Sequence, residues 1–252
     1  TSQPAFQAEP MRVLGRLGWW WLRSRTPRPA TIRLRGWGIR LELPPRWRGV
    51  AKVAYAFRER YERELMALPH LVREGWVAVD VGASYGIYAC VLARLVGPTG
   101  KVYAFEPAEE AFSVLQRNVK RNRLEWVDTY RSACADAAGE GFLRHEDDPS
   151  RNALEVRAPG ASPGEPVGVV RLDDVVPEAD FIKMDVEGAE ELVLRGAAGL
   201  LERSRPIVMF EVNHEAARRL GRPPDGAWRL LEALGYRFLL ADPEGRLTTV
   251  TE

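Results

Sequence analysis

The sequence predicts an α/β protein built on a doubly wound parallel sheet. From Trp76 onward, short apolar runs typical of strands alternate with segments typical of helices, an order that builds parallel strands joined by right-handed crossovers. The 252 residues, of which 46% are hydrophobic, suffice for one substantial core. No uninterrupted apolar run approaches the roughly 18 residues that a membrane-spanning helix needs.

The N-terminal part divides into a short leading segment and a basic extension. Residues 1–10 are interpreted as a cloning remnant without a role. Residues 11–69 form the extension, which starts with a helical segment and continues with TIRLRGWGIRLEL. There, apolar and charged residues alternate around Gly36 and Gly38 and predict a hairpin of two strands. Residues 52–68 then predict one amphipathic helix that covers the core.

Residues 70–252 are expected to form the main domain. VAVDV predicts a strand and YGIYACVLARLV a helix that ends at Gly97 and Pro98, and KVYAFEP and EEAFSVLQRNVKRN repeat this unit. A Gly/Pro/Ser-rich stretch, residues 149–166, predicts a loop over the active-site edge between WVDTYRSACA and VGVVRLDDVV. The core resumes with ADFIKMDVEGAE, a helix ending near Ser204, RPIVMFEVNHE, another helix over residues 227–234, and a terminal hairpin of YRFLLAD and RLTTV.

The stretch VAVDVGASYGIY, residues 77–88, indicates a ligand loop between a strand and a helix. Its glycines are spaced G-x-x-x-G, so a dinucleotide pyrophosphate fits poorly, and Asp80 at the strand end suits an ammonium group better than a phosphate. Glu106 ends the next strand, where an acid can accept hydrogen bonds from both hydroxyls of a ribose. The two acids together predict S-adenosylmethionine, unless they only cap helices.

Four motifs, VDVGASYGIY, FEP, IKMDVEGAE and FEVN, resemble in order and spacing the FkbM family of S-adenosylmethionine-dependent methyltransferases over residues 70–242. The resemblance implies a class I methyltransferase, Rossmann-like sheet of seven strands, the last antiparallel. It also implies O-methylation of a hydroxyl on a sugar, glycoconjugate or natural product. The cofactor contacts that it implies are Asp80, Gly82, Ala83, Gly86, Tyr88, Glu106 and Pro107.

Acids at two later strand ends are candidates for the methyl transfer itself. Asp185 ends FIKMD and Glu211 ends VMFE, so on neighbouring strands both would enter one crevice, with Asn213 in reach. These three could hold Mg²⁺ or Mn²⁺, which would lower the pKa of an acceptor hydroxyl. Without a metal, Asp185, Glu211 or His214 would be the base. The alternative is structural: Asp185 caps the next helix and Glu211 bonds to the backbone.

Three further charged residues lie close to these acids in the sequence. Lys183 shares a strand face with Asp185, and a lysine in a buried strand needs a partner, so it serves either the active site or an ion pair. Glu187 could face the site. Glu190 is expected to support the first turn of the following helix.

The charge of the chain is unevenly distributed. Residues 11–60 contain 13 Lys or Arg against Glu42 and Glu59, a net charge of +11, so the remainder carries −10. Three consecutive tryptophans, Trp19 to Trp21, lie among the arginines. Such a segment can contact an anionic membrane, self-associate, bind nucleic acid, or pack on the protein's own acidic body. We expect a small-molecule or glycan acceptor as the main partner and nucleic acid as the least favoured one.

Two alternative functions stay open at this point. One is an RNA methyltransferase that grips phosphates with the basic segment, and a steep loss of RNA affinity with salt would favour it. The other is a non-catalytic S-adenosylmethionine-binding module. Cys90 and Cys134 show neither zinc spacing nor a disulfide framework, which predicts a cytoplasmic protein, with peripheral membrane contact through the basic segment as an option.

Overall fold

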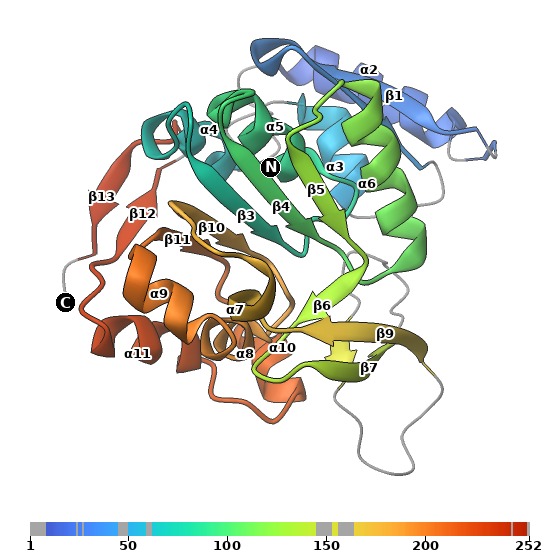
Figure 1. Ribbon diagram of the computed structural model, residues 1–252. Coiled ribbons are helices and arrows are strands. Elements are labelled where there is room, and N and C mark those ends of the chain that lie inside the picture. Colours follow the sequence, from blue (N-terminus) through green and yellow to red (C-terminus); the bar gives the residue numbers. More distant parts are fainter. Residues whose placement is uncertain are drawn as a thin grey trace.

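Five parallel strands form the central sheet in the computed structural model of the protein (Figure 1). The structure describes residues 9–23, 25–26, 28–44, 50–58, 62–144, 153–155, 164–242 and 244–250. The strand order is β11-β10-β3-β4-β5. Their bounds in that order are Ile207–Phe210, Phe181–Met184, Val77–Val81, Lys101–Phe105 and Val127–Tyr130. All four pairings are parallel, which confirms the predicted parallel α/β core.

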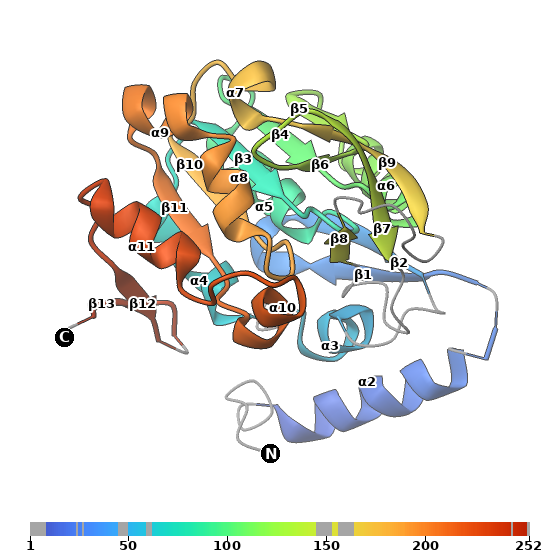
Figure 2. The ribbon, with the colours of Figure 1, turned by 90° about the horizontal axis from the view of Figure 1, so that it is seen from below.

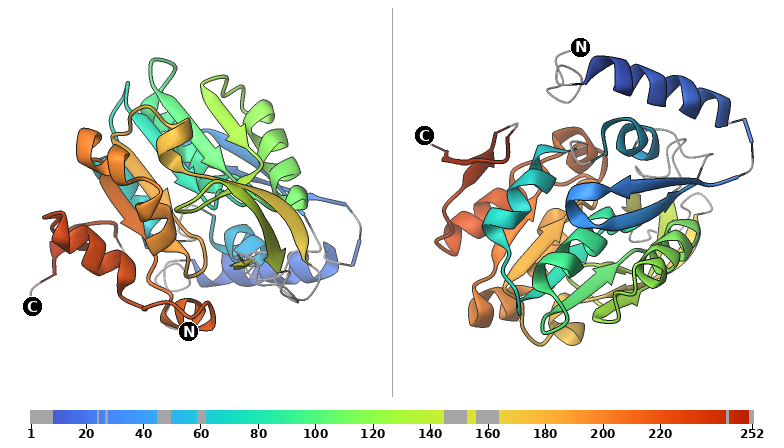
Figure 3. Two further views of the ribbon diagram at one scale, coloured as in Figure 1. Left: turned by 60° about the horizontal axis from the view of Figure 1, so that its bottom comes forward. Right: turned by 90° about the horizontal axis from the view of Figure 1, so that it is seen from above.

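Helices cover both faces of this sheet. One face packs against α5 (Ile87–Val96) and α6 (Glu109–Arg121), and the N-terminal hairpin packs on these two helices. The other packs against α7 (Leu172–Val175), α8 (Glu190–Arg195), α9 (Ala198–Ser204) and α11 (Gly226–Ala233). Successive residues of a strand point to opposite faces, so Ala78 joins the first cluster and Val79 the second. Figure 3 shows the sheet between the two helical layers.

A smaller sheet continues from the carboxyl end of β5. Its order is β6-β9-β7-β8, with β6 at Ser132–Cys134, β9 at Glu165–Val170, β7 at Gly139–Arg144 and β8 at Ala153–Glu155. β6 and β9 are parallel, and the other two pairs are antiparallel. The predicted loop at residues 149–166 lies largely outside the described residues, and its described parts belong to β8 and β9.

The predicted seven-stranded sheet is not confirmed. The terminal hairpin is present, but β12 (Leu239–Ala241) and β13 (Leu247–Thr249) pair only with each other in the described part of the chain. Phe238 stacks on Trp228 of α11 with ring centroids 3.5 Å apart. Gly245 lies so close to α4 that a Cβ there would be 2.6 Å from the carbonyl carbon of Met66. These contacts hold the hairpin away from the central sheet.

The N-terminal extension begins with α2 (Pro10–Arg23) and contains the predicted hairpin, β1 (Ala30–Leu34) with β2 (Ile39–Leu43). The turn passes through Gly38 at φ 62°, a left-handed conformation that favours glycine. Asn122, directly after the end of α6, accepts from the N–H of Arg40 at 2.9 Å and donates to its carbonyl at 2.7 Å. Its side-chain amide therefore substitutes for a neighbouring strand and fixes the hairpin on the core.

The single helix predicted over residues 52–68 is wrong, because the chain forms two helices there. α3 spans Val50–Phe57 and α4 spans Arg63–Leu71. Arg58 has φ 58°, which ends the first helix, and Glu62 is extended at φ −136°. The break brings Glu62 to the central cavity described below.

The second half of the main domain also has more helices than predicted. The helix expected to end near Ser204 is divided into α8 and α9. Gly196 between them lies against the backbone of Ala135, where a Cβ would be 2.0 Å from the carbonyl oxygen. α10 (His214–Arg219) was not predicted. Within the described residues, none of the helices combines the length and the apolar character needed to cross a membrane.

Candidate active site

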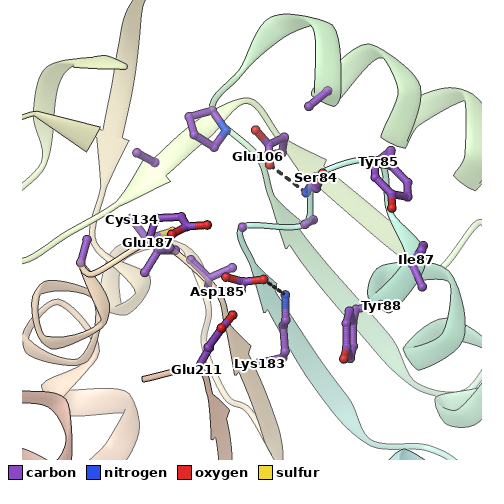
Figure 4. Close-up of a pocket in the computed structure, with 18 of the residues that line it drawn as sticks. Ser84, Tyr85, Ile87, Tyr88, Glu106, Cys134, Lys183, Asp185, Glu187 and Glu211 are labelled. Carbon is purple, nitrogen blue, oxygen red and sulfur yellow. Dashed lines mark hydrogen bonds and ion pairs between the residues drawn. The ribbon is translucent and has the colours of Figure 1, made fainter. Parts of the chain in front are cut away.

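A cavity of about 310 Å³ opens where β3, β4, β10 and β11 end (Figure 4). The loop after β3 and the FEP turn after β4 form one wall. Residues Asp185, Glu187 and Glu211, which follow β10 and β11, form the opposite wall. Parallel strands present their carboxyl ends at one edge of the sheet, and this edge is where ligands bind in open α/β folds.

Backbone contacts fix the glycine loop after β3. Gly82 has φ 78°, and a Cβ at this position would be 2.0 Å from the carbonyl oxygen of Asp185. The N–H groups of Gly82 and Ala83 both donate to the carbonyl of Phe105, at 3.0 and 2.9 Å. Ser84 follows with φ 49°. A side chain at position 82 would separate the two walls, so this glycine is required by packing.

Glu106 is the most firmly held acid of the cavity. One carboxylate oxygen accepts from the N–H of Ser84 at 2.8 Å and the other from the N–H of Ala108 at 2.9 Å. The side chain is buried, and burial raises the pKa of Glu106 to about 7, while the two N–H donors oppose the rise. The carboxylate still lines the cavity and can accept hydrogen bonds from a ligand.

Lys183 places an ammonium group between the two walls. Its Nζ lies 3.7 Å from Oδ1 of Asp80, 3.6 Å from Oδ2 of Asp185 and 4.5 Å from the ring centroid of Tyr88. Burial alone would lower the pKa of Lys183, but the attraction of Asp185, Asp80 and Glu62 raises it above its usual value. The lysine is therefore charged, and it is both an ion-pair partner and a residue of the cavity.

Asp185 and Glu211 meet because their strands are neighbours. Met184 is in register with Phe210, so the two acids leave adjacent strands side by side. Burial, and then the charge of Asp185, raise the pKa of Glu211. This is the behaviour expected of a carboxyl that shares a site with a second acid.

The sequence profile of the family described as the methyltransferase FkbM domain matches residues 80–238. The chain belongs to this family. The match covers more than half of the chain and includes the glycine loop, the FEP turn and both strand-end acids. The predicted family is confirmed, and with it an S-adenosylmethionine-dependent methyltransferase domain.

Curated relatives agree with this assignment. The 31-O-demethyl-FK506 methyltransferase FkbM of Streptomyces tacrolimicus is 32% identical over 163 residues, which cover 50% of this chain and 60% of the relative. A protein-L-isoaspartate O-methyltransferase of Methanothrix thermoacetophila is 30% identical over 113 residues, or 41% of this chain and 50% of the relative. This chain therefore matches about half the length of these relatives.

The similarity to solved structures is low. A methyltransferase FkbM from Methylobacillus flagellatus KT is 16% identical and covers 85% of this chain and 52% of its own, with a TM-score of 0.43. A score this low supports no conclusion about function.

Most of the cofactor contacts implied by the FkbM resemblance line the cavity: Gly82, Ala83, Tyr88, Glu106 and Pro107. Asp80 and Gly86 do not line it. Asp80 is fully buried below the loop, where it pairs with Lys183, and burial raises its pKa. Gly86 has φ 85°, and a Cβ there would be 2.6 Å from Cδ1 of Leu115, so it serves the packing of α5 on α6. Asp80 and Gly86 can therefore influence a ligand only indirectly, Asp80 through Lys183 and Gly86 through the glycine loop.

The proposed metal set does not converge. Asn213 turns away from the two acids, because its Oδ1 accepts from the N–H of Ala216 at 3.0 Å and caps α10. Its Nδ2 donates to Glu187 at 2.9 Å. No cluster of three or more His, Cys, Asp or Glu suited to a metal occurs in the described residues. As a third ligand, Asn213 is therefore not supported.

The structure also places the remaining candidates. His214 begins α10, is exposed and does not belong to the residues that line the cavity. The capping role considered for Asp185 is not seen, because α8 begins at Glu190 without a side-chain cap. Glu190 instead accepts from the N–H groups of Val186 and Gly188, in the turn before the helix, at 3.3 and 3.2 Å. Glu190 thus has the structural role predicted for it.

The sequence analysis missed Glu62 as a residue of the cavity. Its carboxylate accepts a short hydrogen bond from the hydroxyl of Tyr88, whose ring faces Lys183. The pKa of Tyr88 is raised well above its usual value by burial and then by Glu62, so the hydroxyl keeps its proton. In the sequence, Glu62 lies only on the polar side of a predicted helix. That position does not show whether the side chain faces a cavity or solvent.

Proposed function

We propose that the protein transfers the methyl group of S-adenosylmethionine to a hydroxyl of a sugar, glycoconjugate or natural product. The observation that carries the proposal is that one cavity brings Glu106, which two backbone N–H groups hold, together with the strand-end acids Asp185 and Glu211. Two relatives support the oxygen acceptor, since one is named an O-methyltransferase and the other a 31-O-demethyl-FK506 methyltransferase.

The residues of the cavity fit the cofactor. Ligand pockets usually measure about 300 to 1,000 Å³, and this cavity of about 310 Å³ is large enough for one compact ligand. Glu106 would accept from the ribose hydroxyls, and the Gly82 loop lets the ligand approach the backbone. Asp185 would face the positively charged end of the ligand. When bound, the cofactor supplies an electrophilic methyl group on a sulfonium.

Glu211 is the proposed base. It lies on the exposed side of the cavity, where an acceptor can reach it, and its raised pKa makes it a better proton acceptor than an ordinary carboxylate. Asp185 lies 3.6 Å from the ammonium group of Lys183 and is engaged in that ion pair. In this mechanism Glu211 removes the hydroxyl proton while the Asp185–Lys183 pair orients the acceptor oxygen.

A divalent cation between Asp185 and Glu211 is the competing mechanism. Two carboxylates could hold Mg²⁺ or Mn²⁺ together with water. The ammonium group of Lys183 already supplies positive charge 3.6 Å from Asp185, which weakens the attraction of the pair for a second cation. We therefore favour the base.

The test of the function combines binding and turnover. Calorimetric titration with S-adenosylhomocysteine should show one site, and incubation with labelled S-adenosylmethionine and a panel of sugars and polyketide alcohols should label a hydroxyl. Cofactor binding without labelling of any acceptor class, nucleic acid included, would favour a non-catalytic module. Absence of binding would refute the proposal.

A further inference from the structure

α2 has a broad apolar face that is open to solvent. Its five large exposed apolar side chains, with exposed fractions between 51% and 79%, are Met11, Leu14, Trp19, Trp21 and Leu22. Gly15 and Gly18 lie among them, and a Cβ at either position would meet nothing within 4 Å. At 100° per residue, all but Trp19 project to one side of the helix and Trp19 borders it.

The opposite side of α2 attaches the helix to the body. Val13 and Trp20 are buried, and the Trp20 ring lies 5.2 Å from that of Tyr55 on α3. Arg16 donates to the carbonyl of Ala56 at 2.9 Å. α2 therefore lies along the periphery against α3 with its apolar face outward, as Figure 2 shows for the position of the helix.

Arginines surround a second hollow, of about 790 Å³, beside this face. We name it the arginine hollow, and its guanidinium groups belong to Arg12, Arg16, Arg33, Arg35 and Arg58. Among the described residues that line it, Glu9 is the only acid, which leaves a surplus of four positive charges. Glu9 pairs with Arg12 at 2.9 Å. A concentration of guanidinium groups of this kind suits the oxygens of phosphate.

We propose that α2 and the arginine hollow dock the protein on an anionic lipid surface. The apolar face would enter the boundary between headgroups and acyl chains, and the arginine hollow would face the headgroup phosphates. Trp21 fits the interface, since the guanidinium carbon of Arg25 lies over the face of its ring, 3.4 Å from the centroid, and so adds a cation beside the apolar face. Arg12 and Arg16 of the hollow belong to α2, and Arg12 projects within about 20° of Trp19 at the border of the apolar face. The hollow and the apolar face therefore adjoin along one side of the helix, and one orientation can present both.

The charge and the apolar face together select this partner. A second copy of the chain would bring two arginine hollows close to each other, which like charges oppose. Nucleic acid would match the arginines but offers no apolar phase for Met11, Leu14 and Leu22. An anionic membrane complements both properties.

The experiment is co-sedimentation with vesicles of phosphatidylcholine, with and without phosphatidylglycerol. Wild type should bind the mixed vesicles and lose binding as salt rises. Arg12→Gln/Arg33→Gln should lower the partition coefficient about thirtyfold, since each arginine near an anionic surface contributes about fivefold. Leu14→Ser/Leu22→Ser should lower it at least about tenfold on the same vesicles.

Matched controls test the position of these side chains. Leu239→Ser/Leu240→Ser removes two exposed leucines from β12, and Arg229→Gln/Arg237→Gln removes two exposed arginines near the C-terminus. Both control variants should bind vesicles as wild type does. Equal binding by wild type and the α2 variants would overturn the proposal.

Two other outcomes would also overturn it. Calorimetric binding of inorganic phosphate as tight as vesicle binding, with no dependence on the apolar face, would assign the arginine hollow to a free phosphate. A wild-type dimer that Leu14→Ser/Leu22→Ser converts to monomer in light scattering, without any change in vesicle binding, would assign the face to a second copy.

Discussion

Glu106 on one wall of the cavity and Glu211 on the other both follow the end of a strand, but the chain holds them differently. Both oxygens of Glu106 accept backbone N–H groups within a buried turn. Glu211 lies on the exposed side of the cavity, and its surroundings act on it mainly through burial and the charge of Asp185. The proposed function therefore assigns ligand recognition to the carboxylate that the backbone fixes, and proton exchange to the carboxylate that stays accessible.

The largest effect should come from Glu211. Glu211→Gln keeps the size of the side chain but cannot take a proton, so kcat should fall about a hundredfold to ten-thousandfold while cofactor affinity stays within about twofold. Single-turnover assays and calorimetry measure the two quantities. Glu215→Gln, an exposed acid on α10, is the matched control. If Glu211→Gln lowered kcat and cofactor affinity to the same extent, Glu211 would serve cofactor binding as Glu106 does, and the proposed difference between the two walls would be wrong.

The second effect concerns the loop that joins the walls. Gly82→Ala places a methyl group 2.0 Å from the carbonyl oxygen of Asp185 at a φ of 78°, so the loop must shift. Such strain costs about 1 to 3 kcal/mol, and cofactor affinity should fall about tenfold to a hundredfold. Gly36→Ala has no atom within 4 Å of the added Cβ and should leave affinity unchanged. Wild-type affinity in Gly82→Ala would contradict the packing of the walls.

The contrast between the walls also shows what the sequence could predict. Glu106, Asp185 and Glu211 were found because strand patterns fix which residue stands at the carboxyl end, and parallel strands bring those ends together. Glu62 was missed because the break between α3 and α4 depends on the left-handed Arg58 and on tertiary contacts. Neither the left-handed conformation of Arg58 nor these tertiary contacts can be deduced from the helical spacing of apolar residues.

Two other failures have the same kind of cause. Asn213 follows Glu211 closely in the sequence, but its amide caps α10, a helix that the sequence analysis did not predict. The terminal hairpin was predicted, but its place outside the central sheet was not, since the stacking of Phe238 on Trp228 and the contact of Gly245 with Met66 involve distant segments. Local pattern gave the elements, whereas distant contacts decided where they pack.

The third effect is a pH dependence of binding on the Glu106 wall. Ribose hydroxyls donate to the carboxylate form, and the pKa of Glu106 is about 7, so binding should be strong above that pH and weaken below it. Affinity for S-adenosylhomocysteine should be about tenfold lower near pH 6 than near pH 8. Glu106→Gln should bind about tenfold more weakly at the higher pH and lose this pH dependence. Glu110→Gln, an exposed neighbour on α6, is the control.

The smallest effect should follow metal removal, which tests the Glu211 wall without a mutation. If Glu211 is the base, turnover after treatment with excess chelator should stay within about twofold of the untreated enzyme, because the proton leaves through a carboxylate. The pH profile of kcat should then rise through one group whose pKa lies above that of an ordinary glutamate, in the direction given for Glu211. A cation held by Asp185 and Glu211 predicts the opposite: chelation abolishes turnover but spares cofactor binding, Mg²⁺ or Mn²⁺ restores it, and Asp185→Asn raises the metal concentration required. Those results would show that Asp185 and Glu211 hold a metal ion and that Glu211 is not the base. Of the proposed carboxylate roles, only ligand binding by Glu106 would then remain.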